Sequence, residues 1–260
     1  REIELKTGDY TIEPAEKRAG LRLSPDKFTI ERNSRPVIRV WVEKPKEPVK
    51  KEPPLSPDRR AADWLLAKSG VQIRVAQGDK ETQVTRPGEL PTGEFAIVAI
   101  GVPPQAYFGD SDARKLEPLA RLTQLWLAGD RFDDGVVRPL GRLKRLTFLV
   151  LDTTPVTDAG LAGLVELKKL TALGLPRSKV TDAGLKHLAR LPELHILHLD
   201  GTAVTDAGLE QLAEFPALDW LVVVKTKVTD AGVKKLAAAK PKCRIEWDGG
   251  ALGPPAPKKN

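Results

Sequence analysis

The sequence has almost no cysteine, the residue that forms disulfides and thiolate metal sites. Of its 260 residues one, Cys243, is a cysteine and none is a methionine. A single thiol excludes an internal disulfide and a zinc site made of several thiolates. We interpret Cys243 as a small buried hydrophobic residue rather than a nucleophile. No apolar run approaches the ~20 residues that a membrane-spanning helix needs, so we expect no membrane span within this chain.

The chain begins at Arg1, without an initiating methionine. We interpret it as a fragment or a processed product, which leaves targeting segments and partner domains to sequence outside it. Localisation and oligomeric state stay open on this evidence.

The net charge of +7 raises the question of nucleic-acid binding, but its distribution argues against it. Residues 1–60 carry 15 basic and 11 acidic side chains, and residues 240–260 carry five and two. The stretch between them, 61–239, holds 22 of each and is neutral. A nucleic-acid interface needs clustered positive charge on a folded face, so we expect no nucleic-acid partner.

The first part of the chain alternates apolar and polar residues like short β-strands. The segments are "REIELKTGDYTIEP", "LRLSPDKFTIE" and "PVIRVWVE", with turn residues in "TGDY" and "SPDK". Such a unit is too short to bury much core, so we expect the end of a sandwich whose first strands precede Arg1.

A proline-rich segment, "KPKEPVKKEPPLSP", separates this unit from the rest of the chain. Its prolines and alternating charges favour an extended linker. Next, Ser56 and Pro57 are typical of a helix start and Gly70 of the turn after its end. The helix places Ala61, Trp64 and Leu65 on one face, and two strands, "VQIRVAQ" and "EFAIVAIGV", follow.

From Leu122 the sequence repeats every 24 residues, with units starting at Leu122, Leu146, Leu170, Leu194 and Leu218. In each unit "LxxLxL" indicates a short strand, and "GLxxLxxL" indicates a helix. A partial unit precedes the five and a degenerate one, "CRIEW", follows them, as expected of caps. Stacked units of this kind form a parallel sheet on a concave side and helices outside it.

The motif "VTDAG(L/V)" recurs at 156, 180, 204 and 228, and its residues have structural interpretations. The threonines are predicted to cap the helices, and the aspartates to place negative charge at the helix N-termini. The glycines allow close packing between units. Thr154, Ser178, Thr202 and Thr226 are placed to bond backbone groups of the turn after each strand. The regular aspartates also raise the alternative of calcium, but they lack the several convergent oxygens that calcium requires.

These units resemble the leucine-rich repeat superfamily, in particular its ribonuclease-inhibitor-like class with "LTDAGL"-type units, over about residues 95–247. The resemblance implies an α/β fold, a leucine-rich-repeat solenoid, here preceded by a small antiparallel β unit. The serial layout is also similar to the non-kinase regions of planctomycete-type bacterial Ser/Thr kinases and related multidomain surface proteins. Motifs of the kinase itself are absent from the sequence.

The chain is therefore expected to contain five parts. They are a small, incomplete β unit at 1–43, a Pro/Lys-rich linker at 44–57, a helix-plus-strands cap at 58–121, leucine-rich repeats with a C-terminal cap at 122–248, and a disordered tail at 249–260.

The predicted concave face carries large side chains that the repeat does not require, which favours a contact surface for a protein or peptide. The candidate binding residues are Trp126, Phe148, Val150, Ile196, His198 and Trp220. Two alternatives stay open: the N-terminal β unit or linker covers this face, or the tryptophans pack on neighbours in the stack.

No catalytic motif is present, and His187, His195 and His198 form no recognisable metal-binding pattern, so we expect no enzyme activity, cofactor or metal. The leading hypothesis is a non-catalytic binding module. The alternative is an extracytoplasmic sensor or regulatory segment of a larger membrane-anchored Ser/Thr protein kinase, in which case the protein is at the cell surface.

The linker generates the first prediction. Limited proteolysis should cut first between Pro45 and Pro57 and leave a stable fragment that begins near Ser56, because a charged, proline-rich segment has no apolar surface to bury. Mass spectrometry of the fragments checks this. Primary cleavage within 122–240 would contradict the predicted boundary.

Overall fold

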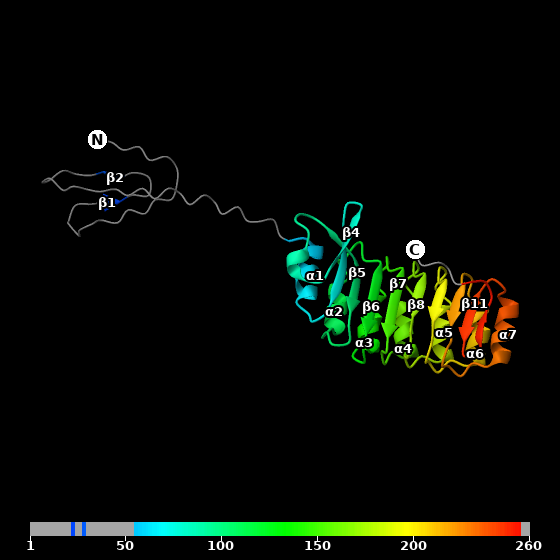
Figure 1. Cartoon of the computed structure of the whole chain (residues 1–260). Coiled ribbons are helices and arrows are strands. Elements are labelled where there is room, and N and C mark those ends of the chain that lie inside the picture. The colour runs from blue at the N-terminus through cyan, green and yellow to red at the C-terminus, as the bar shows by residue number, and fades with distance from the viewer. Residues whose placement is uncertain (1–21, 24–27, 30–54, 256–260) are drawn as a thin grey trace. The chain divides into compact units, whose positions relative to one another are not determined.

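The computed structural model describes residues 22–23, 28–29 and 55–255, in two units divided between Pro54 and Leu55 (Figure 1). In the first unit β1 (Arg22–Leu23) pairs antiparallel with β2 (Phe28–Thr29), as the sequence predicts for this segment. The other strands predicted within 1–43, and the linker as far as Pro54, lie outside the described residues.

The second unit begins with α1 (Pro57–Leu66), and its start is as predicted. The Ser56 hydroxyl accepts a hydrogen bond from the Arg59 N–H at 3.1 Å, which satisfies one of the free amides of the first turn. The helix buries Ala61, Ala62, Leu65 and Leu66 and leaves Trp64 half-buried. It packs against β3 (Gln72–Gln77) and β5 (Ala96–Val102).

The segment between these strands contains a strand that sequence analysis missed, β4 (Lys80–Val84), which pairs antiparallel with β3. Four of its five residues are exposed, so its sequence carries no alternation of apolar residues. The usable signal was the turn: Gly78–Asp79 forms a two-residue loop between the paired residues Gln77 and Lys80. A short 3₁₀ helix, η1 (Pro87–Glu89), follows.

The remaining elements alternate between helices and strands. They are α2 (Asp110–Lys115), β6 (Gln124–Ala128), α3 (Asp134–Leu140), β7 (Phe148–Asp152), α4 (Asp158–Leu161), η2 (Ala162–Leu164), β8 (Ala172–Gly174), α5 (Asp182–Leu188), β9 (Ile196–His198), α6 (Asp206–Leu212), β10 (Trp220–Val222), α7 (Asp230–Ala239), β11 (Arg244–Trp247) and β12 (Gly250–Leu252).

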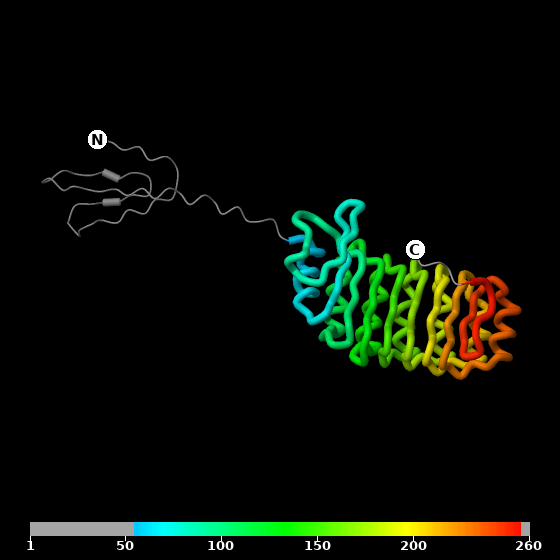
Figure 2. Tube along the Cα trace, in the orientation of Figure 1, coloured from blue at the N-terminus to red at the C-terminus, as the bar shows by residue number. Residues whose placement is uncertain are grey.

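All strands of this unit belong to one ten-stranded sheet in the order β12-β11-β10-β9-β8-β7-β6-β5-β3-β4. The run from β5 to β11 is parallel, and an antiparallel hairpin closes each end. Helices α2 to α7 line one face of the sheet (Figures 1 and 2). The other face, predicted to be the concave one, carries no helix among the described residues and is called the open face below. The unit is a leucine-rich-repeat solenoid, as the resemblance implies.

The core lies between the sheet and the helices and consists of the leucines at the inward repeat positions. Leu125, Leu149, Leu173, Leu197 and Leu221 stack in register on successive strands, each at most 1% exposed. No unit can bury its leucines alone, so each depends on its neighbours for a continuous core.

Neighbouring units are also joined by hydrogen bonds between the repeated motifs. Asp182, the first residue of α5, accepts the backbone N–H of Thr205 through Oδ1 at 2.8 Å and the Thr205 hydroxyl through Oδ2 at 2.6 Å. The Thr205 hydroxyl in turn accepts the N–H of Ala207 and caps α6. The same pair of bonds joins Asp134 to Thr157, Asp158 to Thr181, and Asp206 to Thr229.

The glycine of the motif is required by this junction. A Cβ atom on Gly208 would lie 2.3 Å from Oδ1 of Asp182, which belongs to the preceding repeat. Cβ atoms on Gly160, Gly184 and Gly232 would lie at similar distances from the aspartates of their own preceding repeats. The prediction of close packing between units is confirmed, and the atom approached is the carboxylate. The threonines are N-caps as predicted. The aspartates do more than supply charge to the helix dipole, because they bind the next unit.

The motif changes where the series ends. The first repeat, which starts at Leu122, has Asp133 in place of threonine. The Asp133 carboxylate caps α3 by accepting the N–H groups of Gly135 and Val136. At the other end Asp230 has no following threonine and accepts the indole N–H of Trp247 at 2.7 Å. At the C-terminal end the capping piece thus substitutes for the missing neighbour, whereas at the N-terminal end the first repeat caps its own helix without one.

The prediction that 249–260 forms a disordered tail is wrong at Gly250–Leu252, which form β12. The two-residue loop Asp248–Gly249 turns the chain back along β11. An Asp-Gly pair is among the strongest short signals for a hairpin. The strand that follows this pair is only three residues long, too short to show a pattern of its own. Residues after Pro255 lie outside the described part of the chain.

The stacked core generates the second prediction. Replacing Leu173 or Leu197 by Ala should lower the free energy of unfolding by ~2–5 kcal/mol, because each leaves a cavity in a close-packed core. Urea denaturation checks this. A loss below about 0.5 kcal/mol at both positions, within the range of ordinary surface substitutions, would contradict the inward assignment.

The junctions generate the third. Asp182→Ala should lower the free energy of unfolding by about 1–3 kcal/mol, because the N–H and hydroxyl of Thr205 lose their common acceptor. The matched control is Asp200→Ala, which removes a carboxylate outside the junctions and should cost within about 0.5 kcal/mol. Equal losses for the two variants in parallel urea titrations would count against the role of the junction.

Candidate functional site

The open face is built from side chains that strand register places side by side. Pairing of β6 through β11 aligns the residues of each repeat position in rows that cross the strands. One row contains Gln124, Phe148, Ala172, Ile196, Trp220 and Arg244. The next contains Trp126, Val150, Gly174, His198, Val222 and Glu246. All six predicted binding residues therefore lie on this face.

Three of them form a group on β6 and β7, the N-terminal group. The ring centroids of Trp126 and Phe148 lie 4.9 Å apart with their planes inclined by 43°. Val150 is paired with Trp126 across the strands, and all three side chains are half-buried. Packing between neighbours in the stack, one of the alternatives raised for these aromatics, thus accounts for part of their burial.

The other three form the C-terminal group, on β9 and β10. The His198 and Trp220 rings meet edge to face, with centroids 5.5 Å apart, and Ile196 is paired with Trp220. Burial lowers the pKa of His198, and the charges of Asp200 and Glu246 oppose that shift only partly. The imidazole is therefore neutral at pH 7 and adds to an apolar surface rather than to a charged one.

The strand between the two groups, β8, carries no large side chain on the open face. Its outward residues are Ala172 and Gly174, both buried beside their neighbours. A Cβ atom on Gly174 would lie 3.1 Å from a methyl group of Val150. The six predicted residues are thus two groups flanking a smooth strip of sheet rather than one continuous cluster.

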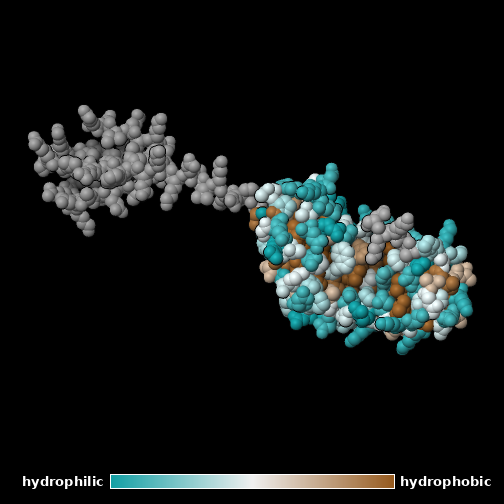
Figure 3. All heavy atoms as spheres, in the orientation of Figure 1, coloured by the Kyte–Doolittle hydropathy of each residue, from teal (hydrophilic) through white to brown (hydrophobic). Residues whose placement is uncertain are grey.

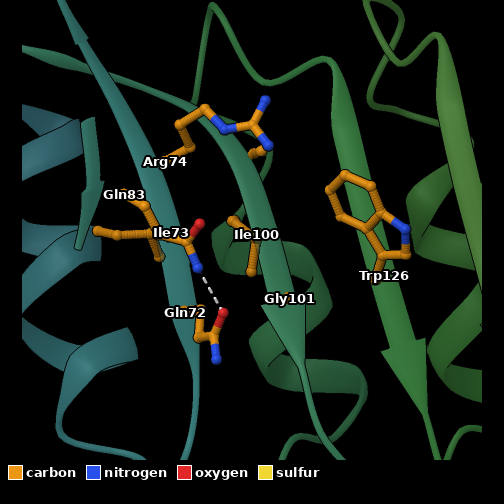
Figure 4. A pocket seen from close by; sticks show the side chains of 8 residues that line it. Gln72, Ile73, Arg74, Gln83, Ile100, Gly101 and Trp126 are labelled. Atoms are coloured by element: carbon orange, nitrogen blue, oxygen red, sulfur yellow. Dashed lines mark hydrogen bonds between the residues drawn. The ribbon is translucent and has the colours of Figure 1, made fainter. Parts of the chain in front are cut away.

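A groove of about 270 Å³ lies beside Trp126 (Figure 4). It lies toward β5, on the side of β6 opposite to Phe148 of β7. Ala99 and Gly101 of β5 form part of its lining. Strand register places Ala99 between Arg74 and Gln124, and Gly101 between Gln72 and Trp126. Gln72 and Gln83 line it too, joined by a hydrogen bond of 2.6 Å. Figure 4 shows Arg74 and Trp126 on opposite sides of β5.

Sequence analysis missed this groove because it took its candidate residues only from the repeats, which begin at Leu122. The signal was present in "VQIRVAQ", in which Gln72 and Arg74 alternate with the buried Ile73 and Val75. Arg74 lies 3.7 Å from Glu81 and 3.5 Å from Gln124 Oε1, so its guanidinium is only loosely engaged.

A second groove, of about 360 Å³, lies at the C-terminal group. Its lining residues are His195, Ile196, Asp219, Trp220, Lys242, Arg244, Pro254 and Pro255. His195 Nδ1 and the Asp219 carboxylate are 2.7 Å apart at an exposed position. The two prolines belong to the C-terminal segment, which sequence analysis did not place near the binding face.

On the face of the second unit that Figure 3 shows, hydrophilic and hydrophobic residues are mixed. Within 55–255 and the two short strands of the first unit, no group of three or more His, Cys, Asp or Glu residues is placed to hold a metal ion.

Burial raises the pKa of the Cys243 thiol to about 11, so it stays protonated at neutral pH and is a poor nucleophile. No helix in the described part of the chain is long and apolar enough to cross a bilayer.

The sequence matches no family model and no curated protein. Among solved structures, it is similar to an internalin from Listeria monocytogenes, with 21% identity, 52% of this chain and 37% of that chain covered, and a TM-score of 0.43. It is similar to internalin C2 of the same organism, with 17% identity, coverage of 74% and 92%, and a TM-score of 0.43. It is also similar to a pollen receptor kinase 3, with 13% identity, coverage of 78% and 100%, and a TM-score of 0.44. The leucine-rich-repeat fold rests on the topology described above.

Proposed function

We propose that this chain is a non-catalytic module that binds a protein or peptide on the open face of its sheet. The residues proposed to contact the ligand are Trp126, Phe148, Val150, Ile196, His198 and Trp220. The observation that carries the proposal is the pair of aromatic groups on a face that lacks helical cover among the described residues. The repeat fold requires the inward leucines but not these outward side chains.

The geometry of the face supports a partner that spans several repeats. The two groups are separated by β8, and strands in a sheet lie about 4.8 Å apart, so β6 and β10 are separated by roughly 19 Å. An extended peptide of about six residues bridges that distance. Each group lies beside a groove that can accept one part of such a ligand.

The alternative assigns the chain to a sensor or regulatory segment of a membrane-anchored Ser/Thr kinase. Only the serial layout of the sequence supports it, and it is compatible with ligand binding because a sensor also binds a ligand. A kinase domain and a membrane helix elsewhere in the parent protein would support it. Nucleic acid is not proposed as a partner, since the region 61–239 has no net charge.

The fourth prediction tests the binding face. Ligands selected from a random peptide library should bind the Trp126→Ala/Trp220→Ala double variant at least about 30-fold more weakly, the equivalent of ~2 kcal/mol for one buried aromatic anchor. Fluorescence anisotropy gives the dissociation constants, and urea titration must first show that both proteins are folded.

The matched control is Tyr107→Ala, which removes an aromatic ring that is 71% exposed on the turn before α2. Affinity should be unchanged in this variant. If the folded double variant retains every selected ligand at full affinity, the open face is not the site, and the helical face becomes the better candidate.

A further inference from the structure

The C-terminal segment is directed onto the open face by a tight crossing of the chain. After β12, Gly253 adopts φ +90°, and a Cβ atom there would lie 2.3 Å from the carbonyl oxygen of Cys243. Only glycine combines this φ with this approach. The following residue, Pro254, accepts a hydrogen bond from Arg244 Nη1 through its carbonyl oxygen at 3.0 Å.

Arg244 brings this contact to the C-terminal group. It is paired with Trp220 in register, and its Nε is held by the Glu246 carboxylate at 2.6 Å. Pro254 and Pro255 consequently line the same groove as Ile196 and Trp220. The chain's own proline pair lies where the proposed function places a ligand.

The groove matches the chemistry of a proline-rich backbone. Such a segment offers carbonyl acceptors but few N–H donors, and it is extended before it binds. The groove supplies donors in Arg244 and Lys242, together with the indole of Trp220. The indole Nε1 is buried and has no hydrogen-bond partner among the described residues. Aromatic-lined grooves of this kind are a common mode of proline-rich peptide recognition.

The segment is weakly attached compared with the strands before it. Beyond β12 the described contact that anchors it is a single hydrogen bond at an exposed position, and both prolines are exposed. Segments with few buried contacts open at low free energy.

From these contacts we propose that the groove at Trp220 is a docking site for proline-rich segments and that Gly253–Pro255 occupies it as a displaceable internal ligand. The inference rests on the proposed function, since it names the chemistry of the ligand at one end of the open face. A partner of the same chemistry must displace the segment, so the segment weakens binding by competition.

The fifth prediction uses a fluorescent peptide with the sequence of residues 253–260, "GPPAPKKN". A chain that ends at Leu252 should bind this peptide, and the full chain should bind it on the order of tenfold more weakly because its site is already occupied. The full-length variant Pro254→Ala/Pro255→Ala should bind as the shortened chain does, which tests the idea without truncation. A peptide with its prolines replaced by alanine keeps the charge and should not bind.

Trp220→Ala in the shortened chain should abolish binding, whereas Tyr107→Ala, which removes an exposed ring on the turn before α2, should leave it unchanged. No binding to the shortened chain, or equal binding to the full and shortened chains, would overturn the inference. If selected library ligands still depend on Trp126 and Trp220 in that case, the proposed function stands. If the library ligands do not depend on these tryptophans but the tail peptide binds through Trp220, the proposed function fails. The inference that this groove binds proline-rich segments then still stands.

Discussion

The carboxylate at the first position of α3, α4, α5 and α6 couples one repeat to the next. It accepts two hydrogen bonds from the following threonine, whose hydroxyl at the same time caps its own helix. The arrangement leaves no room for a side chain on the glycine that faces the carboxylate. The repeated motif is therefore a single device in which valine and leucine fill the core, threonine and aspartate form the junction, and glycine provides the clearance.

The fold was largely predictable because the core obeys a strict period. Leucines at the inward positions mark each strand and each helix, and β-strands such as β7 and β9 fall where the period places them. The role of Asp182 was not predictable in the same way. Its partner, Thr205, lies 23 residues away, and both residues recur in the last four of the five units, so the sequence alone does not distinguish a bond within a unit from one between units. The edge strands β4 and β12 were missed because they bury almost nothing.

The positions of the candidate binding residues followed from the same period, but their grouping did not. Register fixes that Trp126 lies on the same face as Trp220, whereas the gap at Ala172 and Gly174 becomes visible only when the rows are assembled. The approach of Pro254 to Trp220 depends on a turn at Asp248–Gly249 and on the crossing at Gly253, neither of which belongs to the repeat. Local, non-periodic geometry thus determines the ends of the face, where both grooves lie.

Identical junctions have a consequence for how such a chain changes in length. Because the bonds from Asp134 to Thr157 are the same as those from Asp206 to Thr229, a unit can be removed or duplicated by recombination without creating a new kind of contact. Each event moves the two ends of the face closer or further apart by one strand spacing, about 4.8 Å, while Asp133 and Trp247 remain as terminators. The distance between the two ends of the open face, measured across the strands, therefore changes in steps of one 24-residue unit.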